Sequence, residues 1–449
     1  MQAISILAFP WREPAAVLCA FAEEPFAMGL LSGGGGAQGR WSYVLREPDR
    51  TATVRFGDDE NPSVVLRELL GDSQPHDPSG PPFQGGVAGL ASYELGARFE
   101  PVELARHDHW PDMTVGRYPA LLAFDHAAKR VLAVGRGEND ARAQACAQQA
   151  ARWLDGAEHP PVQGPLASAF DPLDAPQVYE RAVAEVVGRI VEGELFQANI
   201  ARGWAGRLTA RARPFDVIRR LLDDSPAPFA AYLRLPSSAV VSNSPERFLA
   251  SSAGGYRVET RPIKGTRPRG RTPGEDAELV EELRGSAKDR AENLMIVDLM
   301  RNDLARVCAP GAVAAPELFR IESFANVHHL VSTVTGRLAP GLTAIDLLRA
   351  AFPPGSITGA PKVQAMKVIS GLEAPRGPYC GSMFWAGFDG ALDSSVLIRT
   401  LAFIEDAEGW SFEARAGAGI VADSDPVAER QETEDKIAAL RRALMGGVA

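Results

Sequence analysis

The hydrophobic and polar positions of the chain predict short strands and amphipathic helices in mixed order. In the first part, apolar runs indicate strands at 42–45, 52–56, 120–125 and 130–135. An alanine-rich stretch at 138–156 indicates a helix, and a proline-rich connector follows it at 158–176. We therefore predict an N-terminal subdomain at 1–165 and a second domain at 170–449.

Beyond residue 178 the periodicity is clearer. Helical patterns lie at 178–200, where the helix runs into a strand, at 275–307 and at 426–445. Strand patterns lie at 228–235, 238–251, 256–266, 395–405 and 410–422, and we expect the third of these strands to end at its proline. Because strands and helices do not alternate regularly, the pattern favours an α+β fold over a doubly wound one.

Composition narrows the class of protein. The chain has 449 residues and a net charge of −10, so a nucleic acid partner is not expected. It contains no apolar stretch of membrane-spanning length, and its N-terminus does not resemble a signal peptide. The four cysteines are far apart in the sequence, as expected of reduced thiols in a cytoplasmic protein: Cys19, Cys146, Cys308 and Cys380.

The last predicted helix has an acidic face. Asp425 is placed to cap its start, and Glu429, Glu432 and Lys436 share one side. The ordinary interpretation is a solvated face with an ion pair between Glu432 and Lys436. The alternative is a magnesium site made of two glutamates and a third acid from elsewhere, for which Glu292 is available.

Lys264 lies in the unusual stretch TRPIKGTRPRG, which has three arginines and no acid. A lysine in such a place is ordinarily a surface cation. To act as a nucleophile it needs a neutral amine and hence a lowered pKa, from burial or from cations such as Arg261, Arg267 and Arg269.

Other segments offer groups for binding a carboxylate. The glycine-rich stretches 353–362 and 416–422, the second predicted as a turn, expose backbone N–H groups. Arg399 is a charged residue within a predicted apolar strand and is suited to a bidentate contact. His328 and His329 are adjacent in a strand, so at most one of them faces a given cleft.

Together these segments resemble the chorismate-utilising enzymes, which include anthranilate, isochorismate and salicylate synthases. The resemblance covers about residues 175–445 and rests on nine ordered motifs. They are SPERF (244–248), TRPIKGT (260–266), AKDRAENLMIVDLMRND (287–303), VHHLVST (327–333), GSITGAPK (355–362), CGS (380–382), IRT (398–400), GAGIVADS (417–424) and QETEDK (431–436). The resemblance implies two large, mainly antiparallel sheets packed face to face with helices outside, and a chorismate-binding catalytic domain at 170–449.

Within that family the residue at the middle of PI-x-GT separates the activities. Anthranilate synthases usually have alanine there, whereas Lys264 is similar to a lysine nucleophile that attacks C2 of chorismate. Ammonia then enters at C4 and expels the lysine, which gives 4-amino-4-deoxychorismate on the route to 4-aminobenzoate and folate. The alternatives are an anthranilate synthase component, an isochorismate or salicylate synthase, which uses a lysine as a base toward water, and an amino-acid-sensing regulatory subunit on the same fold.

The resemblance also implies roles for other positions. Glu246 is similar to the general acid and His329 to a histidine facing the ring, while Glu292, Glu429 and Glu432 resemble ligands of Mg²⁺. Residues similar to those that contact chorismate are Thr358, Gly359, Tyr379, Arg399, Gly417, Gly419 and Lys436.

The source of nitrogen is expected to lie outside the chain. None of the four cysteines lies in a Gly-x-Cys-x-Gly motif, so ammonia is expected to come from a separate glutamine amidotransferase subunit. The segment LLSG at 30–33 replaces the LLES-like segment of tryptophan-inhibited relatives. Inhibition by tryptophan is therefore not expected, although an N-terminal pocket that binds tryptophan for a structural purpose is compatible with the sequence.

Overall fold

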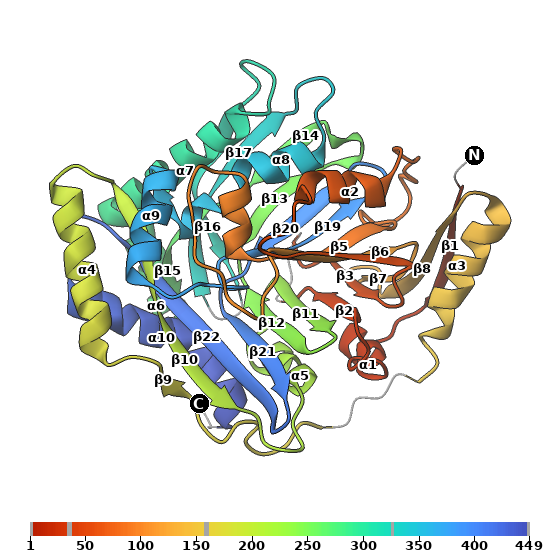
Figure 1. Ribbon diagram of the computed structural model, residues 1–449, viewed down its shortest axis with the longest axis horizontal. Coiled ribbons are helices and arrows are strands. Elements are labelled where there is room, and N and C mark those ends of the chain that lie inside the picture. Colours follow the sequence, from red (N-terminus) through yellow and green to blue (C-terminus); the bar gives the residue numbers. More distant parts are fainter. Residues whose placement is uncertain (1–2, 34–37, 157–160, 325–326, 447–449) are drawn as a thin grey trace.

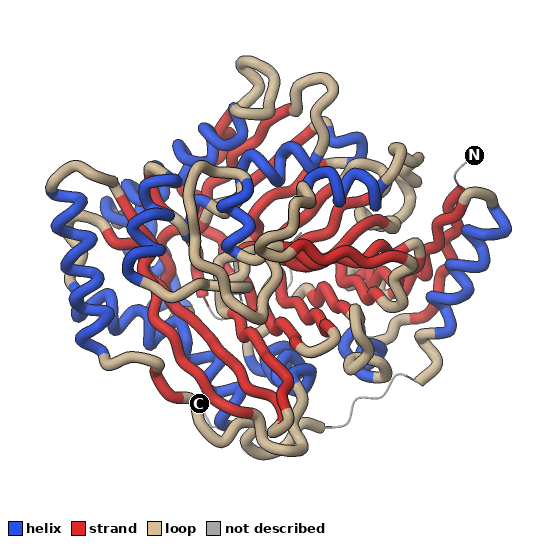
Figure 2. The backbone as a smooth tube through the Cα atoms, viewed as in Figure 1, coloured by secondary structure: helices blue, strands red, loops and turns tan. Residues whose placement is uncertain are grey.

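The computed structural model describes residues 3–33, 38–156, 161–324 and 327–446. Two large antiparallel sheets lie against each other, and helices cover their outer faces (Figures 1 and 2). The predicted α+β class, with two face-to-face sheets and helices outside, is confirmed. No described helix is long and apolar enough to cross a membrane.

The first sheet has twelve described strands, and all of its pairings are antiparallel. In spatial order they are β1 (Ala3–Pro10), β8 (Arg130–Gly137), β7 (Ala120–Asp125), β3 (Trp41–Leu45), β2 (Met28–Leu31), β11 (Phe229–Leu235), β12 (Ser238–Ser244), β21 (Thr400–Asp406), β22 (Gly409–Ile420), β10 (Gln197–Arg207) and β18 (Gly359–Ala360), with β9 (Asp171–Pro172) beside β10.

The second sheet has ten described strands. In spatial order they are β15 (Ile263–Pro268), β17 (Val327–Arg337), β14 (Arg257–Thr260), β13 (Arg247–Ser251), β20 (Leu392–Val396), β19 (Ser382–Gly387), β5 (Gly86–Ala91), β6 (Met113–Tyr118) and β4 (Arg50–Val54), with β16 (Ala314–Ser323) beside β17.

The helices lie in the connections between strands. They are α1 (Pro14–Cys19), α2 (Pro62–Leu70), α3 (Asp140–Arg152), α4 (Pro176–Val191), α5 (Pro214–Asp224), α6 (Pro273–Gly285), α7 (Ala287–Ala305), α8 (Ala344–Ala351), α9 (Lys362–Leu372) and α10 (Pro426–Met445), with short 3₁₀ turns η1 (Tyr93–Arg98), η2 (Ala253–Gly255) and η3 (Gly355–Ile357).

Apolar side chains hold the layers together. Leu45 and Val240 of the first sheet pack in one cluster with Leu90 and Trp385 of the second, so the inner core lies between the sheets. Separate clusters join the second sheet to α2, α7 and α8, and the first sheet to α1, α3, α5 and α10. Burying one such large apolar side chain contributes about 1.5–3 kcal/mol, and burial on both faces of each sheet explains the long apolar runs of the strands.

The two segments predicted as 1–165 and 170–449 share both sheets. Strands β1, β2, β3, β7 and β8 continue the first sheet beside β11, and β4, β5 and β6 continue the second beside β19. The contact between β2 and β11 joins residues about two hundred positions apart, such as Leu30 and Ala231. The N-terminal segment therefore completes the sheets that carry the C-terminal motifs.

The predicted and observed elements differ in several places. The helix expected at 275–307 is two helices, because Ser286 ends α6 and its hydroxyl accepts the backbone N–H of Asp289 as the cap of α7. The strand was expected to end at Pro262. In the structure a new strand, β15, begins directly after this proline with the paired residue Ile263.

Candidate active site

Lys264 lies at a bulge in β15. Ile263 pairs with Val331 and Thr266 with His329, so β15 carries one more residue than β17 between these pairs. Gly265 takes φ of 83°, which favours glycine. The bulge turns the Lys264 side chain out of the regular alternation of the strand and toward the other sheet. This is seen at Gly419 of β22, where an added Cβ would lie 3.1 Å from the Nζ of Lys264.

Burial is the main cause of the lowered pKa of Lys264. Loss of hydration lowers it, the Lys436 ammonium adds to that effect, and the carboxylates of Glu292, Glu246 and Glu432 oppose it. A neutral amine is the form that can act as a nucleophile.

The arginines around Lys264 do not supply the cationic field that the sequence suggested. Arg261 is paired with Glu322, Arg267 with both Glu282 and Asp289, and Arg269 with Asp276. Each guanidinium is therefore neutralised locally. The ion pairs instead fasten the stretch 260–270 to α6, α7 and β16.

Three glutamates from α7 and α10 surround the same space. Burial raises the pKa of Glu292, with Lys264 opposing, and burial also raises the pKa of Glu429, whose carboxylate accepts the Ser424 hydroxyl at 2.7 Å. Burial acts to raise the pKa of Glu432, but Lys436, 2.6 Å away, lowers it overall. Asp425 caps α10 as predicted, accepting the N–H groups of Val427 and Ala428.

The three glutamates fit a divalent cation in donor type. Magnesium prefers hard oxygen ligands, and the pKa of each of the three carboxylates responds to the others or to shared lysines. Within the described part of the chain, however, no three acidic, histidine or cysteine side chains converge closely enough to hold an ion. Glu432 is turned to Lys436, so ion binding requires that pair to open.

Glu246 is a buried carboxyl group that interacts electrostatically with Lys264. Burial raises its pKa to about 7, and the Ser356 hydroxyl, Lys264 and the N–H of Ile263 oppose this rise. Glu246 is 5% exposed, so near neutral pH its carboxyl group can carry a proton and donate it to a reacting group as a general acid.

A cavity of about 570 Å³ meets this group of residues at Lys436. His329, Arg399 and Lys436 line it, together with Pro245 and Phe324. The Nδ1 of His329 lies 2.9 Å from the Thr266 hydroxyl, whereas its buried Nε2 has no hydrogen-bond partner among the described residues. Burial, with help from Arg399, lowers the pKa of His329 to about 3, so the imidazole is neutral.

Arg399 is not within a strand, contrary to the sequence-based expectation. It lies between β20 of the second sheet and β21 of the first, with φ of 51°, where the chain crosses from one sheet to the other. Burial lowers the pKa of Arg399, and no carboxylate among the described residues offsets that effect. Its guanidinium is thus available to an anion in the cavity.

The sequence pattern suggested a turn at Gly417 and Gly419. In the structure both residues lie within strand β22. They pair with Ala201 and Asn199 of β10, and Lys436 donates to the Gly417 carbonyl at 2.8 Å. The absence of side chains here leaves room for neighbouring polar groups, since a Cβ on Gly417 would lie 2.9 Å from the Asn199 amide nitrogen.

Three residues predicted to contact the substrate do not line the cavity beside Arg399. The Thr358 hydroxyl donates to the Pro354 carbonyl at 2.8 Å, and a Cβ on Gly359 would lie 2.1 Å from the backbone oxygen of Gln197. Both residues thus hold β18 against β10. Tyr379 lines a second cavity of about 220 Å³, beside Arg376 and not beside Arg399.

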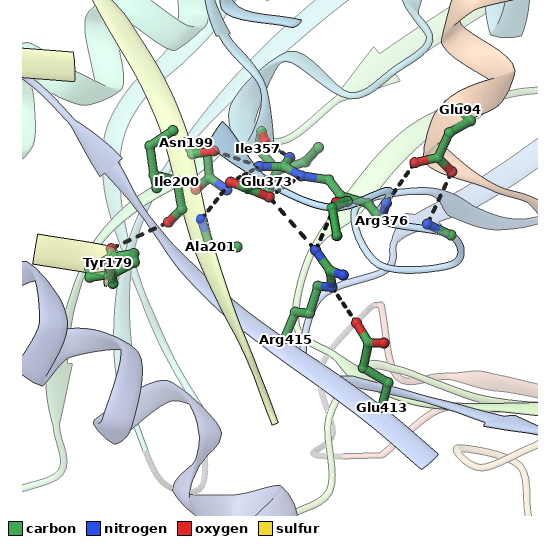
Figure 3. A network of polar contacts seen from close by, with 12 residues as sticks. Glu94, Tyr179, Asn199, Ile200, Ala201, Ile357, Glu373, Arg376, Glu413 and Arg415 are labelled. Carbon is green, nitrogen blue, oxygen red and sulfur yellow. Dashed lines mark hydrogen bonds and ion pairs between the residues drawn. The ribbon is translucent and has the colours of Figure 1, made fainter. Parts of the chain in front are cut away.

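A buried ion-pair network supports β10 (Figure 3). Arg376 pairs with Glu373 at 2.9 Å and donates to the Asn199 carbonyl at 2.6 Å, while Glu373 accepts the N–H of Ala201 at 2.7 Å. These contacts satisfy the edge of β10 beyond Ala198, where its pairing with β18 ends. Side chains thus replace a neighbouring strand at the part of β10 that faces the site.

The site residues predicted from the sequence did not include two polar residues of β10. Gln197 and Asn199 are almost completely buried, and Asn199 lies opposite Gly419 of β22. The sequence did contain a signal, since they are polar residues at alternate positions of an apolar strand and must therefore share one face.

The chain belongs to the chorismate binding enzyme family, whose model matches residues 33–442. The fold, the crossing at Arg399 and the position of Lys264 near the glutamates of two helices agree with this family. It is 40% identical to aminodeoxychorismate synthase component 1 of Klebsiella aerogenes over 97% of this chain and 98% of that protein. It is also 40% identical to anthranilate synthase component 1 of Streptomyces coelicolor, over 95% of this chain and 86% of that protein.

A solved structure shows the same architecture. Anthranilate synthase component I of Streptococcus pneumoniae superposes with a TM-score of 0.78 at 29% identity, covering 91% of this chain and 93% of that chain. Overall identity to these two relatives is equal, so particular residues of the site also bear on the choice between their activities.

Proposed function

We propose that the chain is component 1 of an aminodeoxychorismate synthase, which replaces the C4 hydroxyl of chorismate with an amino group. The observation that carries this proposal is Lys264, whose amine reaches from the bulge in β15 to Gly419 of the opposite sheet and is partly desolvated there. Direct addition of ammonia at C2 requires no amine from the protein at this position, whereas amination at C4 through a covalent adduct requires a nucleophile such as Lys264.

The reaction proceeds in two displacements. The neutral amine of Lys264 attacks C2 of chorismate, the ring double bonds shift, and the bond between C4 and its hydroxyl breaks. The hydroxyl leaves as water with a proton from Glu246, which regains one from the new secondary amine. Ammonia then attacks C4, the double bonds shift back, and the bond between C2 and Lys264 breaks. The nitrogen added at C4 loses one proton, and the departing amine of Lys264 gains one, so the neutral lysine is restored.

The cavity groups bind and orient the substrate. Arg399, which lacks an acidic partner among the described residues, is suited to a carboxylate of chorismate, and Lys436 adds a second cation on the same wall. The neutral His329 presents its unpaired Nε2 to the reacting ring. Glu292, Glu429 and Glu432 would hold Mg²⁺, which would supply positive charge to the other carboxylate.

Ammonia is proposed to come from a separate glutamine amidotransferase subunit. Cys146, Cys308 and Cys380 are buried, and burial raises the pKa of each thiol, that of Cys380 to about 12. Such thiols are poor nucleophiles for glutamine hydrolysis. The well-separated free thiols also support a cytoplasmic location.

Product identification tests the proposal. Purified chain is incubated with chorismate, Mg²⁺ and ammonium, and the product is identified by mass and by its fragmentation. We expect 4-amino-4-deoxychorismate, and without ammonium a covalent adduct on Lys264 that Lys264→Ala abolishes. Formation of anthranilate or isochorismate, or an adduct on a different residue, would contradict the assignment, and no turnover with any nitrogen source would favour a sensing subunit.

We also propose that an N-terminal cavity of about 150 Å³ is the place where tryptophan would bind. Leu30 and Ser32 of the LLSG segment line it with Trp41, Arg247 and Asp393, which combines apolar surface with charges of both signs. Calorimetric titration with tryptophan tests this, and unchanged catalytic rates at saturation are expected because the pocket is predicted to be structural.

A further inference from the structure

Gln197 is a buried side chain without hydrogen-bond partners. It is the first residue of β10 and is fully buried, yet neither its amide oxygen nor its amide nitrogen is bonded to any described residue. Buried polar atoms are nearly always paired, because an unpaired one loses its hydration without compensation. An amide left unpaired beside a reactive site therefore calls for a functional explanation.

The position of Gln197 relates it to Lys264. A Cβ placed on Gly419 would lie 3.0 Å from the Gln197 Nε2 and 3.1 Å from the Lys264 Nζ, so both groups flank the space that this glycine leaves open. The backbone of Gln197 is held in place, since it pairs with Ala360 and its carbonyl packs against Gly359. Only the amide is free to turn, and its oxygen and nitrogen can exchange places by a half turn.

An amide suits a nucleophilic amine better than a carboxylate does. Glu246, Glu292 and Glu432 all act on Lys264, and each favours its ammonium form. A neutral amide oxygen can accept one N–H of the amine without adding negative charge, and doing so fixes the direction of the nitrogen lone pair.

We propose that Gln197 is a positioning residue for Lys264: its amide oxygen accepts a hydrogen bond from the amine and directs the lone pair toward the cavity. This inference rests on the function proposed above. It explains why a polar residue is retained, without a partner of its own, at the start of an otherwise apolar strand. It also gives a reason for glycine at position 419, where a side chain would separate the amide from the amine.

The test separates positioning from packing. Gln197→Met keeps the length of the side chain and removes both polar atoms. Three quantities are measured: the rate of Lys264 adduct formation at saturating chorismate without ammonia, the Kd of chorismate and the thermal midpoint. We expect the adduct rate to fall by about tenfold to a hundredfold. The Kd should stay within about twofold, and the midpoint should not fall, because no existing hydrogen bond is lost.

Gln84→Met is the matched control. Gln84 is also fully buried, but its amide is bonded to Arg136 and to the backbone of Asp77, far from Lys264 in the sequence. This variant should lower the thermal midpoint and leave the adduct rate unchanged. If Gln197→Met itself loses its cooperative transition, Gln197→Asn takes its place, since it keeps the amide but shortens its reach.

Two results would overturn the inference while leaving the proposed function intact. One is a wild-type adduct rate in Gln197→Met, and the other is a loss of rate that is matched by equal losses of chorismate affinity and thermal stability. A wild-type protein that forms no adduct at Lys264 would instead reject the proposed function itself, and this inference with it.

Discussion

The glycine at the bulge beside Lys264 gives the sharpest test of how the site is built. Gly265 has φ of 83°, a conformation that costs an alanine about 1–2 kcal/mol. A Cβ there would also lie 2.9 Å from the Cβ and Cγ of Asp289 and from Leu283. Asp289 cannot easily give way because Arg267 holds it at 3.2 Å. Such crowding costs about 1–3 kcal/mol more.

We therefore expect Gly265→Ala to lower the free energy of unfolding by about 2–5 kcal/mol. Because the strain is relieved by moving the bulge, Lys264 is displaced and its adduct formation should fall by about tenfold or more. Urea titration followed by circular dichroism measures the first effect, and intact-mass analysis of chorismate-treated protein measures the second.

The control is Gly188→Ala, in the last turn of α4. A Cβ there meets no described atom within 4 Å, so alanine should stabilise the helix by about 1 kcal/mol and leave the adduct rate unchanged. If Gly265→Ala unfolds within about 0.5 kcal/mol of the wild type and forms adduct normally, the bulge does not position Lys264.

Three further predictions concern the groups around the cavity. The pKa of Glu246 is raised to about 7, so ionising this carboxyl group destabilises the folded protein as pH rises from its ordinary pKa of 4.5 through 7. Glu246→Gln should therefore be about 3 kcal/mol more stable than the wild type at pH 8 but equal to it at pH 4, by urea titration at each pH. Its turnover should be greatly reduced, and an equal stability at both values would refute the raised pKa. Arg399→Lys loses bidentate contact and should raise the KM for chorismate about tenfold with a smaller change in kcat, whereas an unchanged KM would remove Arg399 from the binding site. Glu429→Gln should weaken Mg²⁺ binding about tenfold or more in calorimetric titrations without chorismate, and unchanged affinity would place the ion elsewhere.

The sequence predicted those features that depend on neighbours along the chain. Asp425 followed by proline predicted the start of α10, and the spacing of Glu429, Glu432 and Lys436 predicted the shared face and the Glu432–Lys436 pair. The fold class and the family followed from the ordered motifs. The helix cap and the acidic face depend on residues within a few turns of one helix, and each family motif is a continuous stretch of sequence.

Only the tertiary structure decided how those pieces meet. The bulge at Lys264 arises from the pairing of β15 with β17, about sixty residues away, and the crossing at Arg399 arises because β20 and β21 belong to different sheets. The sequence left open whether burial or the nearby arginines would lower the pKa of Lys264. In the structure distant acids such as Glu322 pair with the arginines, and burial is the main cause of the lowered pKa. The sequence determined which groups are present. Distant strand pairing and burial determined which of them face one another and in what charge state, because both depend on contacts that the local pattern does not contain.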